Sequence, residues 1–144
     1  MINGRNGTNG LSDELKADAV HYFKNGVSNI AKVPQKDGLY VGLKHVHEGC
    51  GIVYRGVICA IDAVALARSI PEDKLPKNVD EIRSFLKAKS ALNGKVIKAF
   101  NKLYAELHKV GYYGRKDDID PDIIKLGISN ARFVIEKLTG KRIS

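Results

Sequence analysis

The apolar positions of this chain recur at steps of three and four, which is the spacing of one face of an α-helix. The most apolar segment lies between residues 39 and 70. A helix that is apolar nearly all round is buried or spans a membrane, and Arg55, Asp62 and the internal glycines argue against a span. We therefore expect a central helix over about 39–70 in a soluble bundle. One of its faces carries Leu43, Val46, Cys50, Val53, Val57, Ala60, Val64 and Ala67.

Several glycines lie inside this predicted helix. Gly42, Gly49, Gly51 and Gly56 fall within the predicted helix, where each glycine costs about 1 kcal/mol relative to alanine. A helix that keeps several of them is expected to have close helical neighbours, or a kink near Gly49.

Typical start and stop signals bound the other apolar segments. Ser12 is a candidate N-cap, Asn78 and Glu81 have capping-box spacing, and Asp120-Pro121-Asp122 combines a cap with a proline at the first helical position. Gly140 is expected to close the last helix. The chain is therefore predicted to be an all-α, antiparallel bundle of five helices without strands, with helices at about 12–33, 39–70, 78–93, 95–110 and 120–140.

Domain organisation follows from composition. Residues 1–11 are rich in glycine and asparagine and lack an apolar period, so we expect a disordered arm. Residues 12–144 are enough for one domain with a core of its own. The start of the chain has no secretory signal, which favours the cytoplasm.

Two cysteines and four histidines give no metal site. Cys50 and Cys59 lie nine positions apart on the central helix, which places them on opposite sides. We expect both to be free thiols packed as small apolar groups, as in a reducing compartment. His45 and His47 cannot face one ion either. No metal and no cofactor is therefore expected.

A polar stripe follows the central helix. Glu48, Arg55 and Asp62 are spaced by seven positions and so share one side of it. They are expected to be paired or solvent-facing charges, or else to line a pocket in which Arg55 grips an anionic group.

The segment from His108 to Arg115 gathers an imidazole, the two phenols of Tyr112 and Tyr113, and a guanidinium. It either seals the end of the bundle or forms the rim of a ligand site.

The chain is basic, with a formal net charge of +8. Between residues 83 and 109 there are seven cationic side chains and one acid. These charges form a solvated face, or a patch for nucleic acid or an acidic protein partner if they cluster in space. The patch candidates are Arg83, Lys87, Lys95, Lys98, Lys102 and Lys109.

The order of these pieces resembles the HEPN family of bacterial helical domains. The likeness rests on the pattern Tyr54, Val57, Ala60 and Ala63 on a long helix and on the tyrosine-rich turn from His108 to Tyr113. It spans about residues 12–140 and implies a homodimer. Ribonucleases of that family share an arginine followed four to six residues later by histidine, and this sequence has no such pair.

Three hypotheses follow. The first is a non-catalytic helical binding or interaction module without a membrane partner. The second is a divergent toxin-type ribonuclease or RNA-binding domain that uses Arg55, His108 and Arg115 as catalytic residues. The third is a bundle that binds a small ligand, with Glu48, Arg55, Asp62, Tyr112 and Tyr113 in a polar pocket.

Overall fold

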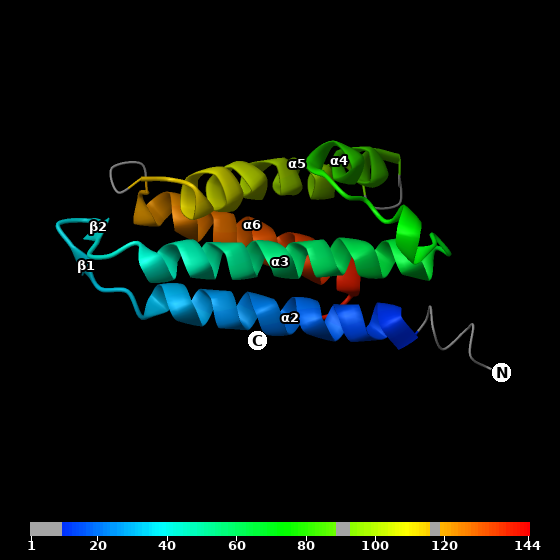
Figure 1. Cartoon of the computed structure of the whole chain (residues 1–144), viewed down its shortest axis with the longest axis horizontal. Coiled ribbons are helices and arrows are strands. Elements are labelled where there is room, and N and C mark those ends of the chain that lie inside the picture. The colour runs from blue at the N-terminus through cyan, green and yellow to red at the C-terminus, as the bar shows by residue number, and fades with distance from the viewer. Residues whose placement is uncertain (1–9, 89–92, 116–118) are drawn as a thin grey trace.

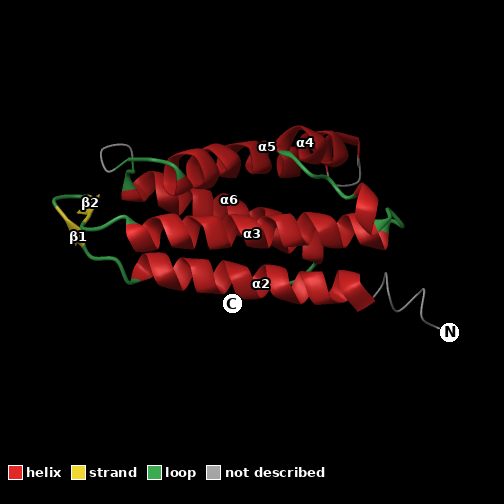
Figure 2. Ribbon diagram, viewed as in Figure 1, coloured by secondary structure: helices red, strands yellow, loops and turns green. Residues whose placement is uncertain are grey.

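The computed structural model describes residues 10–88, 93–115 and 119–144. Within these ranges the chain forms five α-helices and one minimal two-stranded sheet (Figures 1 and 2), which confirms the prediction of an all-α bundle. The predicted arm at 1–11 lies outside the described residues except for its end, where Leu11 is already helical. The α-helices are α2 (Leu11–Ala31), α3 (Lys44–Ala67), α4 (Val79–Ala88), α5 (Asn93–Leu103) and α6 (Pro121–Thr139). The remaining elements are strands β1 (Gln35–Lys36) and β2 (Leu39–Tyr40), the 3₁₀-helix η2 (Glu72–Lys74) and the π-helix η4 (Tyr104–Tyr112).

The helix α3 is the core of the molecule, as its apolar pattern predicts. It packs most extensively against α2, and also against α6 and η4. In Figure 1 it lies between α2 on one side and α6 on the other, with α5 beyond α6. By length and composition alone α3 could cross a membrane, but 56% of its most apolar window is buried inside the bundle. That degree of burial is typical of the core helix of a soluble domain.

Glycines hold α2 and α3 at close range. A Cβ atom added to Gly26 of α2 would lie 2.6 Å from the carbonyl oxygen of Gly49, and one added to Gly49 of α3 would lie 2.7 Å from the carbonyl oxygen of Gly26. Farther along, a Cβ on Gly56 would lie 2.8 Å from the carbonyl oxygen of Ala19. Real Cβ atoms do not approach backbone this closely, so only glycine fits. The expectation of close helical neighbours is confirmed at Gly49 and Gly56. It is wrong at Gly42, which precedes α3 and where a Cβ would meet nothing within 4 Å.

The predicted start of the central helix at residue 39 is wrong. Asp37 and Gly38 adopt positive φ angles of 55° and 77°, which turn the chain back on itself. Leu39 then pairs with Lys36, and Tyr40 with Gln35, in the antiparallel sheet. Tyr40 is buried with 4% of its surface exposed, and burial raises the pKa of its phenol to about 12. The helix therefore begins at Lys44, and it ends at Ala67 rather than at residue 70.

The predicted caps are correct at two of three helices. The Asn78 side chain accepts from the backbone N–H of Glu81 at 2.9 Å, and that of Asp120 accepts from the N–H of Asp122 at 2.9 Å. Gly140 closes α6 in the left-handed conformation, as predicted. Ser12 is not a cap, because it lies inside α2, is buried, and donates its hydroxyl to the Ala63 carbonyl oxygen at 2.8 Å.

The fourth predicted helix is longer and more irregular than the expected span of 95–110. It begins as α5 at Asn93 and continues without a break as η4 to Tyr112, with the wider i→i+5 hydrogen bonding of a π-helix. Long π-helical segments are rare and frequently mark functional sites.

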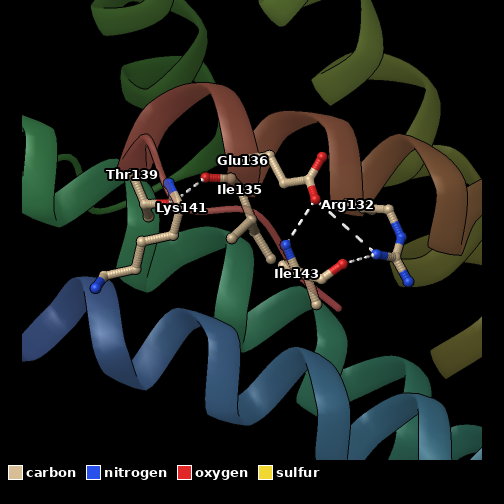
Figure 3. A network of polar contacts seen from close by, with 6 residues as sticks. All are labelled: Arg132, Ile135, Glu136, Thr139, Lys141 and Ile143. Atoms are coloured by element: carbon tan, nitrogen blue, oxygen red, sulfur yellow. Dashed lines mark hydrogen bonds and ion pairs between the residues drawn. The ribbon is translucent and has the colours of Figure 1, made fainter.

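The last residues of the chain are fixed to α6 by a polar network (Figure 3). The Ile143 N–H donates to a carboxylate oxygen of Glu136 at 2.8 Å, and its carbonyl oxygen accepts from Arg132 Nη1 at 2.5 Å. The Arg132 guanidinium also lies 5.2 Å from the centre of the Phe23 ring of α2. The network therefore buries Ile143 and links α6 to α2.

The glycine contact between α2 and α3 generates a stability prediction. Gly49→Ala should lower the free energy of unfolding by about 1–3 kcal/mol, because the new methyl group overpacks a backbone contact. This change in the free energy of unfolding is measured by chemical denaturation, with circular dichroism as the signal. Gly94→Ala is the matched control, since a Cβ there meets nothing within 4 Å and alanine favours the helix. Equal stability of Gly49→Ala and wild type would contradict the close approach.

Candidate functional site

A groove of about 700 Å³ runs over α3, between α2 and η4. Its volume lies within the range of ligand-binding sites, roughly 300–1,000 Å³. The helix α3 supplies its floor, while α2 and the end of η4 supply its walls. We call it the aromatic groove, because four tyrosines and one histidine line it. Its lining residues are Tyr22, Asn29, Glu48, Gly51, Ile52, Tyr54, Arg55, His108, Tyr112 and Tyr113.

One wall of the aromatic groove is formed by His108 and Tyr112, which belong to a longer row of stacked rings. Tyr104, His108 and Tyr112 are spaced by four positions and share one face of η4. The His108 ring centre lies 5.1 Å from that of Tyr104 and 6.1 Å from that of Tyr112, with near-parallel planes. Tyr54 of α3 lies against this row, 4.7 Å from His108. Tyr113 meets the Tyr112 ring edge-on at 4.7 Å.

Two residues of α3, Gly51 and His47, hold Tyr112 and the end of η4 in position. A Cβ on Gly51 would lie 3.1 Å from two ring carbons of Tyr112, so glycine lets that ring rest on the helix. His47 Nε2 donates to the Gly114 carbonyl oxygen at 2.9 Å, which ties the start of α3 to the chain just after η4. As a result Tyr112 and Tyr113 are held in place although 43% and 69% of their surfaces are exposed.

The charges of the aromatic groove come from α3. Arg55 and Glu48 are exposed and line it together. The Glu48 carboxylate lies 3.0 Å from Nδ1 of His45. Within the described ranges no ion pair joins Arg55 to Glu48 or to Asp62, so the expected pairing along the stripe is not observed. The guanidinium of Arg55 is the cationic group of this groove.

Asp62 lies outside the lining of the aromatic groove. Its Oδ1 atom is buried and has no hydrogen-bond partner among the described residues. Burial raises the pKa of its carboxyl to about 6, an effect that the nearby Arg55 charge partly offsets. Four of the five residues predicted for a polar pocket therefore line one groove, and Asp62 is a separate, poorly solvated carboxyl.

His108 and Tyr54 are both poorly solvated on the groove wall. Burial, followed by the charge of the neighbouring Lys109, lowers the pKa of His108. Burial, followed by the neighbouring Tyr104, raises the pKa of Tyr54 to about 12. At neutral pH the groove therefore presents a neutral imidazole and a protonated phenol.

The catalytic hypothesis required three residues together. Arg55 and His108 line the same groove, while Arg115 is exposed and is not among the residues that line it. Cys50 and Cys59 are buried and free, and burial raises the pKa of their thiols to about 12 and about 11. They are therefore poor nucleophiles at neutral pH. In the part of the chain that is described, no cluster of His, Cys, Asp and Glu could hold a metal ion.

The predicted basic sector divides into separate groups. Arg83 and Lys109 both lie over the Tyr104 ring, with their charged groups 5.3 Å and 5.4 Å from its centre. Arg83 also donates to Asn101 at 2.7 Å. Lys87 is exposed on α4. Of the six patch candidates, Lys95, Lys98 and Lys102 line a common groove, which lies between α5 and α6.

Sequence reasoning missed half of the aromatic groove. Tyr22, which is only partly buried on α2, is not among the predicted site residues, and neither is Asn29. Tyr54 carried the family resemblance but was not named as a site residue. A tyrosine at the border of an apolar stripe was the available signal, because its ring can be packed while its hydroxyl stays accessible.

The Asp62 carboxyl generates a prediction about pH. A raised pKa means that the folded state binds this proton more tightly than the unfolded state. This group therefore lowers the free energy of unfolding as the pH rises from about 4 to about 6. Asp62→Asn should be more stable than wild type at pH 7 by about 1–2 kcal/mol, allowing for its partial exposure. The difference in free energy of unfolding between the variant and wild type should fall toward zero near pH 4, as urea denaturation at each pH would measure. A difference that does not change with pH would contradict the raised pKa of Asp62.

Comparison with known proteins places the chain in a family without an assigned function. No curated protein matches it. A solved structure described as a protein of unknown function from Dyadobacter fermentans is similar over 90% of this chain and 96% of that one, with 25% identity and a TM-score of 0.72. A family model described as a domain of unknown function (DUF5618) matches residues 14–140. The chain therefore belongs to the DUF5618 family.

Proposed function

We propose that this chain is a non-catalytic binding module and that the aromatic groove is its binding site. The observation that carries the proposal is the combination of five aromatic or imidazole rings with one guanidinium in a single groove of about 700 Å³. Few polar groups in a mostly ring-lined cleft are typical of small-molecule sites. The ligand that suits this chemistry is a planar ring that carries an anionic group.

The ring of such a ligand has partners on both sides of the groove. Tyr22 of α2 faces the space from one wall, and Tyr112 with Tyr113 from the other. Exposed phenol rings offer flat, rigid surfaces for stacking at a small entropic cost. His47 and Gly51 already hold the Tyr112 side in position, so little ordering remains to oppose binding.

The anionic group has one clear partner. Arg55 is the cation that lines the groove, and no described carboxylate forms an ion pair with it. A guanidinium binds carboxylates and phosphates with two parallel hydrogen bonds. Asn29 on the opposite wall supplies a further polar side chain.

The relationship to HEPN domains and the homodimer belong to this proposal as well. The order of the helices and the tyrosine-rich end of η4 support the relationship. The homodimer rests on the resemblance to that family alone. Analytical ultracentrifugation that finds only monomers at high concentration would rule out the homodimer.

The ligand proposal predicts a thermal shift that depends on Arg55. A panel of nucleoside monophosphates and aromatic carboxylates should contain members that raise the melting temperature. A ligand at a hundred times its Kd adds about 2.7 kcal/mol of stability. Uncharged nucleosides supply only the ring of such a ligand, and inorganic phosphate supplies only its anionic group. Each alone should therefore raise the melting temperature less.

Arg55→Ala should abolish the shift, and Arg68→Ala should keep it. Arg68 is the matched control because it is exposed at the far end of the same helix. The proposal fails if no member of the panel stabilises the protein, or if Arg55→Ala responds as strongly as wild type.

RNA cleavage remains the second candidate, because Arg55 and His108 line one groove and the imidazole is neutral there. A neutral histidine can act as a general base. If this candidate is correct, metal-free incubation with a labelled RNA should yield fragments, and His108→Ala should remove them. His21→Ala is the control, since that histidine is exposed on α2. Intact RNA with wild-type protein would exclude cleavage and leave the binding proposal standing.

A further inference from the structure

A second, positively charged groove lies between α5 and α6. It measures about 250 Å³, and it is lined by Lys95, Lys98, Ala99, Lys102, Asn130 and Phe133. We call it the lysine groove. It shares no lining residue with the aromatic groove, so binding at the two sites can be tested separately.

The lysines form one wall of this groove. Lys95, Lys98 and Lys102 are spaced by three and four positions and so share one face of α5. At 1.5 Å per residue they extend over about 10 Å of helix. Lys98 and Lys102 are exposed, and no carboxylate in the described parts of the chain forms an ion pair with either. Their positive charge is therefore available to an external anion.

The opposite wall of the lysine groove comes from α6. Asn130 donates to Oε1 of Glu106 at 2.9 Å, which places the one acid of the basic sector next to a residue of this wall, against the three lysines of the other wall. The Phe133 ring is covered by a fourth cation, because Nζ of Lys137 lies 5.7 Å from its centre. That ring is thus occupied rather than offered for stacking.

We propose that the lysine groove binds the phosphodiester backbone of a nucleic acid without reading its sequence. Its volume is below the usual range of small-molecule pockets, roughly 300–1,000 Å³, which favours a chain lying across the lysines. Lysine is a strongly hydrated point charge on a flexible stem and acts on phosphates through charge alone. The three lysines follow one another along about 10 Å of α5, which suits the regularly spaced charges of a phosphodiester strand. An acidic peptide is the alternative occupant that the test below separates.

Salt dependence tests this inference. Binding of a short, fluorescently labelled single strand is followed by anisotropy at several salt concentrations, with RNA and DNA of the same sequence. The logarithm of the binding constant should fall linearly with the logarithm of the salt concentration, by about 0.7 for each phosphate contact with a single strand. Replacing Lys98 and Lys102 together by glutamate should therefore flatten the slope by about 1.4.

A charge-matched variant is the control. Lys24→Glu with Lys32→Glu changes the net charge by the same amount at exposed positions associated with α2 and should keep the wild-type slope. Circular dichroism verifies the helical content of both variants. RNA and DNA, and two unrelated base sequences, should bind alike because they share the backbone chemistry.

Three results would overturn the inference. The first is an equal loss of slope in the control, which would mean that net charge alone acts. The second is a strong preference for one base sequence or one sugar. The third is competition by poly-glutamate as effective as that by RNA at equal salt, which would assign the groove to acidic protein segments instead. None of these results bears on the aromatic groove, because Arg55→Ala leaves the lysine groove intact.

Discussion

The close contact between α2 and α3 is the constraint on which the rest of the structure depends. At Gly26 and Gly49 the two backbones are in direct contact, so the helices approach more closely than any residue with a Cβ atom would permit. Such contacts exclude water and gain dispersion energy over many atoms. They also fix the rotation of α3 about its own axis. That rotation decides which of its residues enter the core and which lie at the surface.

With α3 held in this way, its partly exposed side becomes the floor of the aromatic groove. Glu48, Ile52 and Arg55 follow one another there at steps of four and three. The same rotation leaves Asp62 with one buried oxygen that has no partner in the described chain. A carboxyl in that position opposes folding once it is ionised. Natural proteins tolerate such groups where function requires them, but nothing in the described structure assigns Asp62 a role.

The π-helical end of the fourth helix makes the groove aromatic. Tyr104, His108 and Tyr112 stack along one face of η4, while Arg83 and Lys109 sit over the Tyr104 ring. These two cations are consequently engaged with an aromatic face and contribute less to the lysine groove than their place in the sequence suggests. The continuous helix formed by α5 and η4 therefore contributes to two different surfaces. Its rings face α3 in the aromatic groove, and its lysines lie beside α6 in the lysine groove.

The sequence by itself determined the helical segments, the central place of α3, the caps at Asn78 and Asp120, and the meaning of Gly49 and Gly56. Each of these is encoded by residues near one another in the chain, through periodicity, capping hydrogen bonds or glycine at a helix contact. Only the tertiary structure decided the hairpin at residues 35–40, the π-helical turns, the union of Tyr22 with His108 in one groove, and the division of the basic sector. These features depend on how helices distant in sequence are rotated and packed against one another, and no local pattern records that rotation.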